Sequence, residues 1–248
     1  MFHTKIIIAS SLKEVGRMAA DLFEQVINNK PWCVVGLATG STPLPLYREL
    51  IARDRAGRLN FSRARSVNLD EYKGLSPDHP QSFRRFMQEN LFAHISIKQE
   101  NILFPDGLTL NAEAMCKDYE RRIEAWGGIE LQLLGIGHNG HIGFNEPCDH
   151  FPNHTHEVKL SAVTRNANKR FFPSLDEVPK AAFTMGVGTV MSARKIVMLI
   201  TGGDKAEILN RAFFGPVTPE VPASILQFHP NVTLIADEAA YGSLQRQA

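Results

Sequence analysis

The sequence has few cysteines, no long apolar run and no excess of either charge. Its three cysteines lie far apart without a CxxC pair, which argues against a disulfide scaffold and against a zinc site built from cysteines. No apolar segment approaches the roughly 18–20 residues that cross a bilayer, and the apolar run 6–9 is too short for a signal-peptide core. We therefore expect a cytoplasmic protein that does not contact a membrane.

The charges are almost balanced, with 27 Lys and Arg against 26 Asp and Glu, which gives a formal net charge of +1. This balance provides no general attraction to nucleic acid or to anionic lipid, so we expect neither as a partner. Hydrophobic residues make up 44% of the 248 residues, enough to form a sizeable core. A local basic pocket is still compatible with these numbers.

Short apolar runs alternate with amphipathic helical patterns along the chain. The runs are rich in Val, Ile and Leu, which suits strands buried on both faces of a parallel sheet. They cover residues 5–9, 33–37, 66–69, 131–136, 195–200 and 232–236. Helical spacing covers residues 11–28, 112–126 and 204–214. The alternation predicts an α/β fold with an open, mostly parallel, Rossmann-like sheet and helices on both faces.

No Gly/Ser-rich linker and no internal repeat divides the chain, so we predict a single domain over residues 1–248. Residues 148–180 are polar, contain several histidines and are interrupted by prolines, although 162–172 could be helical. We interpret this stretch, called the excursion below, as a possible lid over a site on the same domain. In such sheets, ligands bind at the carboxyl ends of the strands.

The loop after the strand 33–37 has the composition of an anion site. Thr39, Ser41 and Thr42 supply hydroxyls, Gly40 permits a tight turn, and Pro43 favours the start of a helix. Backbone N–H groups at helix starts bind anions, and the absence of a P-loop lysine favours a phosphate monoester over a nucleoside triphosphate. An ordinary Ser/Thr helix cap is the alternative.

Two adjacent acids, Asp70 and Glu71, directly follow the predicted strand 66–69. Neighbouring side chains in extended backbone point to opposite faces, so one acid can enter a cleft while the other has a structural role. A carboxylate at the carboxyl end of a strand is a candidate general base. A helix cap or a surface turn is the alternative.

The segment 135–147 contains the most candidate residues. It matches G-x-G-x-x-G after a strand, but no helical pattern follows, so we do not predict a dinucleotide site. His138, His141 and Glu146 could suggest a metal, yet the segment is not helical and H-E-x-x-H is absent. We favour His141 as a proton carrier oriented by Glu146 and Asn139. A loop histidine bonded to backbone is the alternative.

Two cations could face an anionic ligand. Lys205 lies near the start of a helix, where a positive charge runs against the helix dipole unless an anion compensates it. Arg170 offers a side chain suited to a forked grip on phosphate. A solvated surface lysine is the alternative for Lys205.

Together these segments resemble the glucosamine-6-phosphate deaminase family, over nearly the whole chain. The most specific motif is the H-I-G-F-N-E-P run at 141–147. The other matching motifs lie at 37–43, 68–72, 137–140, 184–189, 202–206 and 222–229. The related 6-phosphogluconolactonases share the fold and a GxGxxGH turn but continue differently after that histidine.

The resemblance implies that D-glucosamine 6-phosphate and water give D-fructose 6-phosphate and ammonia, without a cofactor or a metal. By analogy, Asp70 moves a proton between C2 and C1 of the opened sugar. His141 opens the pyranose ring, supported by Glu146 and Asn139. The phosphate and the substrate would be held by Thr39, Gly40, Ser41, Thr42, Arg170 and Lys205.

The chain departs from the family pattern in two places. Many members carry Asp where this chain has Asn139, which cannot exchange a proton and would act by orientation. Residues 148–156 do not match the effector site of allosteric members, and the C-terminus is short, so we expect a small, unregulated form. We predict a monomer, and a homo-oligomer is the alternative.

Three other functions are alternatives. They are a 6-phosphogluconolactonase-like hydrolase, a galactosamine-6-phosphate deaminase, and a non-catalytic sugar-phosphate sensor on the same fold. A sensor has no need of Asp70, His141 and Glu146 together.

Overall fold

The computed structural model describes residues 4–242, and its centre is a seven-stranded parallel sheet with the strand order β1-β10-β9-β6-β2-β3-β5. The strands are β1 Lys5–Ala9, β2 Val34–Leu37, β3 Arg65–Asn68, β5 Ile102–Leu103, β6 Leu131–Leu134, β9 Ile196–Ile200 and β10 Val232–Asp237. Strands β2, β6 and β9 are buried along their whole length, as expected for runs of apolar residues between two helical layers.

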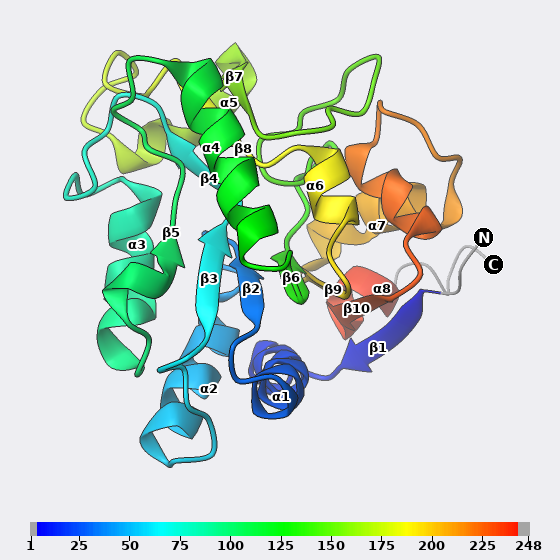
Figure 1. Ribbon diagram of the computed structural model, residues 1–248. Coiled ribbons are helices and arrows are strands. Elements are labelled where there is room, and N and C mark those ends of the chain that lie inside the picture. Colours follow the sequence, from blue (N-terminus) through cyan, green and yellow to red (C-terminus); the bar gives the residue numbers. More distant parts are fainter. Residues whose placement is uncertain (1–3, 243–248) are drawn as a thin grey trace.

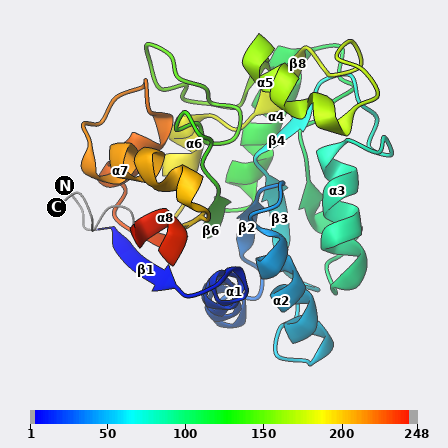
Figure 2. The same cartoon turned by 180° about the vertical axis from the view of Figure 1, so that it is seen from behind.

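Helices cover both faces of this sheet. Helices α4 and α6 lie in front of it in Figure 1, and α2 and α8 lie on the opposite side in Figure 2. The α-helices are α1 Leu12–Asn29, α2 Leu44–Arg55, α3 Phe83–Asn90, α4 Ala112–Ala125, α5 Ala162–Asn168, α6 Val187–Met191, α7 Ala206–Phe214 and α8 Glu238–Gly242. The 3-10 helices are η1 Phe92–His94, η2 Gln99–Asn101, η3 Lys169–Phe171, η4 Gly203–Lys205 and η5 Pro222–Phe228. The α/β prediction is confirmed.

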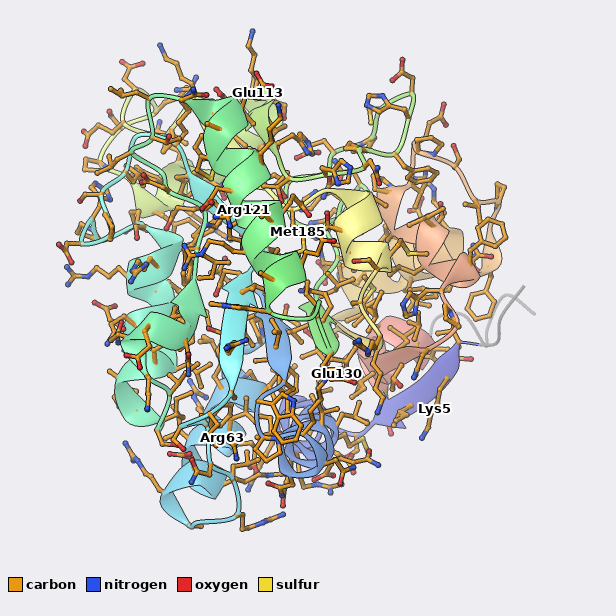
Figure 3. The ribbon with its side chains drawn as sticks, in the orientation of Figure 1. Lys5, Arg63, Glu113, Arg121, Glu130 and Met185 are labelled. Carbon is orange, nitrogen blue, oxygen red and sulfur yellow. The ribbon has the colours of Figure 1, made fainter. Side chains whose placement is uncertain are left out.

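Local sequence explains where several helices begin. Ser11, Ser82, Asn111 and Ser161 each accept a hydrogen bond from the backbone N–H three residues later, at the starts of α1, α3, α4 and α5. In Figure 3, Glu113 and Arg121 lie along helix α4. Within residues 4–242, no helix combines the length and the apolar character needed to cross a bilayer.

A second, three-stranded antiparallel sheet was not predicted from the sequence. It consists of β4 Asp70–Tyr72, β8 Ala181–Thr184 and β7 His156–Lys159, in the order β4-β8-β7. Its own hydrophobic cluster contains Tyr72, Phe144, Leu160, Phe172, Val178 and Ala182. Figure 1 shows this small sheet beyond the end of β3.

The expected boundaries need several corrections. The predicted strand 131–136 ends at Leu134. The predicted strand 66–69 ends at Asn68, and the chain then joins the second sheet. The excursion is not wholly irregular, because it contains β7 and α5. Strands β5 and β8 were missed. Strand β7 is polar and half exposed, so pairing with β8 rather than its own composition makes it a strand.

The strand order determines which loops can meet. Strands β9, β6, β2 and β3 are consecutive neighbours and parallel, so the loops after them share one edge of the sheet. Gly36 in β2 permits part of this packing, since a Cβ there would lie 1.9 Å from Oε1 of Gln132 in β6. The candidate loops of the sequence are the ones that follow these four strands.

Candidate active site

The loop between β2 and α2 presents its hydroxyls without using them as a helix cap. Gly40 has φ of 105°, which permits the tight turn, and Pro43 occupies the N-cap position with no side-chain capping bond. The simple Ser/Thr cap considered above is therefore wrong for this loop. Ala38, at the start of the loop, is fixed by the Tyr47 hydroxyl, which donates to its carbonyl.

The two adjacent acids have different surroundings, as their alternation predicted. Glu71 accepts hydrogen bonds from the backbone N–H groups of Tyr72, Phe83 and Arg84, at 2.8 to 2.9 Å, and so caps helix α3. Asp70 is 7% exposed at the start of β4. Burial, and secondly the charge of Glu71, raises the pKa of Asp70 to about 8. Asp70 is therefore the acid available for chemistry.

The segment after β6 forms a compact turn rather than the start of a helix, as the sequence indicated. The N–H of Gly137 donates to the carbonyl of His141, and the N–H of Gly140 donates to that of Gly137, both at 3.0 Å. A Cβ on Gly137 would lie 2.0 Å from the His141 imidazole. Glycine is therefore required at 137 for the ring to lie against the backbone.

A hydrogen-bond relay orients the His141 imidazole. Its Nδ1 lies 2.7 Å from Oδ1 of Asn139, and Nδ2 of Asn139 donates to Oε2 of Glu146 at 2.6 Å. Because an amide oxygen can only accept, Nδ1 carries the proton and Nε2 carries a lone pair. Glu146 lies 3.8 Å from Nδ1, so it acts on the ring mainly through Asn139.

Burial lowers the pKa of His141, while the charge of Glu146 opposes the shift and the charges of Lys205 and His138 add to it. The ring is therefore neutral near pH 7, with Nε2 able to accept a proton.

Gly143 joins this turn to Asp70. A Cβ on Gly143 would lie 3.5 Å from Oδ2 of Asp70 and 2.8 Å from Oγ1 of Thr184. The neighbouring Phe144 N–H donates to the same Thr184 hydroxyl at 3.0 Å. The carboxylate of Asp70 thus lies against the backbone two residues after His141, although the two are 71 positions apart in the sequence.

Asn145 joins the same turn to the segment that directly follows β8. Its amide donates to the carbonyls of Ile142 and Met185, both at 2.8 Å. Met185, labelled in Figure 3, in turn donates its N–H to the carbonyl of Leu69, directly before Asp70. The backbone on either side of the site is therefore fixed by buried hydrogen bonds.

Lys205 reaches the His141 turn, and Arg170 does not. Lys205 is half-buried at the end of η4, and its Nζ donates to the carbonyl of Ile136 at 3.1 Å. Burial lowers the pKa of Lys205, against the opposing charge of Asp204. Arg170 is exposed in η3, with its guanidinium 4.7 Å from the ring centre of Phe171.

The histidines of the turn face separate partners. Nε2 of His138 lies 2.6 Å from Oδ2 of Asp204, which bridges the loops after β6 and β9, whereas His141 faces Asn139. Over residues 4–242, the grouping of potential metal ligands is instead Cys148, Asp149 and His150, whose ligand atoms lie within 4.8 Å of one another. Sequence reasoning did not single out this group.

Sequence reasoning missed Thr164 as a partner of the site. Its hydroxyl donates to Oε1 of Glu146 at 2.8 Å, from helix α5 of the excursion. No local signal connects two residues that lie 18 positions apart in different elements. Gly137, in contrast, had a signal, because it belongs to the glycine pattern around His141.

Known proteins resemble this chain along most of its length. Residues 9–235 match the family model described as glucosamine-6-phosphate isomerases/6-phosphogluconolactonase. A glucosamine-6-phosphate deaminase of Thermoanaerobacter pseudethanolicus is 50% identical over 236 residues, which cover 95% of this chain and 93% of that protein.

Solved structures separate the two activities that this family model names. A monomeric glucosamine-6-phosphate deaminase superposes with a TM-score of 0.93 at 43% identity, covering 97% of this chain and 100% of the other. A 6-phosphogluconolactonase from Leishmania guyanensis reaches 0.77 at 22% identity, covering 96% and 98%, and shares the fold alone. The chain is therefore an enzyme of the glucosamine-6-phosphate isomerase/6-phosphogluconolactonase family and belongs to its glucosamine-6-phosphate deaminases.

Proposed function

We propose that this chain converts D-glucosamine 6-phosphate and water into D-fructose 6-phosphate and ammonia, with no cofactor or metal. The observation that carries the proposal is the buried Asp70 carboxylate beside the turn that holds the His141–Asn139–Glu146 relay. A proton shift along an amino sugar needs such a carboxylate, and ring opening needs a group that exchanges protons near neutral pH.

Ring opening falls to His141. Its Nε2 takes the proton of the C1 hydroxyl, and the imidazolium then gives this proton to the ring oxygen as the C1–O5 bond breaks. Asn139 and Glu146 keep the imidazole in the tautomer that leaves Nε2 free. Asn139 cannot itself take or lose the proton, so its contribution is orientation.

Isomerisation falls to Asp70. The ionised carboxylate removes the C2 proton of the open aldehyde, and a proton of the substrate ammonium passes to O1, which gives the neutral enolamine. Asp70 then delivers its proton to C1, which leaves an iminium at C2. Water then adds at C2 and ammonia leaves. In the free protein Asp70 holds its proton up to about pH 8. The ammonium group of the substrate beside it favours the ionised form.

The phosphate anchors the sugar at a distance from the reacting carbons. We assign it to the hydroxyls and backbone of the β2–α2 loop and to Lys205, with Arg170 joining them when the excursion closes over the substrate. The loop residues in this assignment are Thr39, Gly40, Ser41 and Thr42. Anchoring through a non-reacting group positions C1 and C2 against Asp70.

The proposal also covers the organisation of the protein. Residues 1–248 act as a single domain, the excursion 148–180 acts as a lid, and the enzyme works as a monomer without allosteric control. Cytoplasmic location agrees with free thiols at Cys33, Cys116 and Cys148.

The test is incubation of the purified protein with glucosamine 6-phosphate, with assays for ammonia and for fructose 6-phosphate. Equimolar formation of both supports the proposal. Hydrolysis of 6-phosphogluconolactone without ammonia release would replace it with the lactonase function. Galactosamine 6-phosphate, assayed in parallel, measures the preference at C4, and a higher kcat/KM for that sugar would reassign the substrate.

A further inference from the structure

Glu146 is held at both carboxylate oxygens, and one of its partners comes from the excursion. Nδ2 of Asn139 donates to Oε2 at 2.6 Å, and the hydroxyl of Thr164 donates to Oε1 at 2.8 Å. Asn139 continues the chain of hydrogen bonds to Nδ1 of His141. Thr164 is therefore the outer end of a chain that terminates at the imidazole.

Helix α5 fixes the Thr164 hydroxyl in turn. Oγ of Ser161 accepts from the Thr164 N–H at 3.1 Å, and the two hydroxyl oxygens lie 2.9 Å apart. Because Thr164 gives its hydroxyl hydrogen to Glu146, Ser161 donates in this second contact. Nη2 of Arg165 donates to the carbonyls of Leu175 and Val178, at 2.7 and 3.3 Å, which fastens the helix to the later part of the excursion.

We propose that Thr164 is a positioning residue for the His141–Asn139–Glu146 relay and makes its geometry depend on where the excursion lies. The inference rests on the proposed deaminase function and adds a residue to it. A carboxylate bonded at one oxygen alone can rotate about its terminal torsion, which is broad in glutamate. Rotation of Glu146 would release Asn139 and so loosen the imidazole. Thr164 touches no reacting atom.

The decisive variants are Thr164→Val and Thr164→Ser. Valine keeps the branched shape and removes the donor, so we expect kcat to fall about 10-fold, the change that corresponds to one hydrogen bond to a charged group. KM stays within about twofold, because phosphate and sugar contacts do not involve this side chain. Serine restores the donor and brings kcat back to within about twofold of the parent.

Ser161→Ala is the matched control. It removes the cap of the same helix but leaves the Thr164 hydroxyl its bond to Glu146, so kcat is expected within about twofold of the parent even if the midpoint of thermal unfolding falls. A loss of kcat in Ser161→Ala equal to that in Thr164→Val would overturn the positioning role, because it would show that helix stability alone matters.

A measurement independent of turnover separates this inference from the proposed function. The nitrogen-15 NMR signals of His141 should report a single Nδ1–H tautomer in the parent and in Thr164→Ser, and a mixture in Thr164→Val. An unchanged tautomer together with parental kcat in Thr164→Val refutes the inference while the function stands. Failure of the parent to release ammonia refutes the function, and the NMR comparison still decides the role of Thr164.

Discussion

The buried carboxyl of Asp70 makes the stability of the folded protein depend on pH. This carboxyl is buried, whereas the carboxylate oxygens of the adjacent Glu71 accept hydrogen bonds from backbone N–H groups of α3. Unfolding releases Asp70 to water, where it ionises near pH 4, whereas the folded protein keeps the proton until about pH 8. Between these values the folded state binds more protons, so stability contributed by this group is lost as pH rises.

We therefore expect Asp70→Asn to stop ammonia release and to make the protein more stable above neutral pH. The gain in the free energy of unfolding should be about 5 kcal/mol at pH 8 and close to zero at pH 4. Urea unfolding at both pH values measures the difference. A stability gain that is the same at pH 4 and pH 8 would contradict the raised pKa, and parental turnover in this variant would contradict the role as base.

His141→Gln tests the second residue. Glutamine cannot exchange protons with the sugar oxygens, so turnover of the pyranose should fall about 100-fold or more. An acyclic analogue that bypasses ring opening should lose much less, and comparison of the two kcat/KM losses gives the result. Equal losses on both substrates would assign His141 to a later step.

At the scale of one element, the turn after β6 depends on two glycines, because the absence of a Cβ leaves space for neighbouring side chains. Gly137 leaves room for the His141 ring, and Gly143 leaves room for Asp70 and Thr184. Gly143 has φ of 59°, so a substitution there would also strain the backbone, whereas Gly137 has an ordinary φ. The space at Gly137 can therefore be tested without strain.

Gly137→Ala is expected to displace the imidazole, because the new Cβ would lie 2.0 Å from it. Activity should fall about 100-fold, the size of effect that a displacement of about 1 Å produces. Gly135→Ala is the matched control, since a Cβ at Gly135 meets no atom within 4 Å. Steady-state kinetics of the two variants decides the matter, and equal activity would mean that the ring adapts.

At the scale of the whole molecule, the order of the strands in the sheet brings the loops of the site together. Neighbouring β9, β6, β2 and β3 carry their following loops to one edge of the sheet. The second sheet adds a wall there, since Thr184 of β8 pairs with Asp70 of β4 and bonds the Phe144 N–H of the turn. The excursion shares the hydrophobic cluster of that sheet through Leu160 and Phe172. The site is thus built between two sheets.

Similarity to a monomeric deaminase leads us to expect a single copy in solution. Light scattering coupled to size exclusion should give a mass near 27.6 kDa, independent of protein concentration. Substrate saturation should then be hyperbolic, because cooperative binding through subunit contacts is absent in a monomer. A stable larger mass, or a sigmoidal curve, would contradict this expectation.

The sequence alone predicted the parallel sheet, because each strand that is buried on both faces is a continuous apolar run. The sequence also predicted the turn after β6, because its glycines and His141 lie within a few residues of one another. It also predicted that Asp70 and Glu71 point to opposite sides, since alternation is a local property of extended chain. Which of the two acids lies in the site depended on helix α3, whose N-terminus takes Glu71.

Contacts between distant segments were decided by the tertiary structure alone. Strand β7 is polar and exists through its pairing with β8, and Thr164 meets Glu146 only because the excursion packs on the second sheet. The sequence identified Arg170 as a cation suited to phosphate. Only the structure shows that its side chain is exposed and that its guanidinium lies over the ring of Phe171. Local patterns record burial and backbone conformation, whereas a hydrogen bond between two elements leaves no periodicity in either of them.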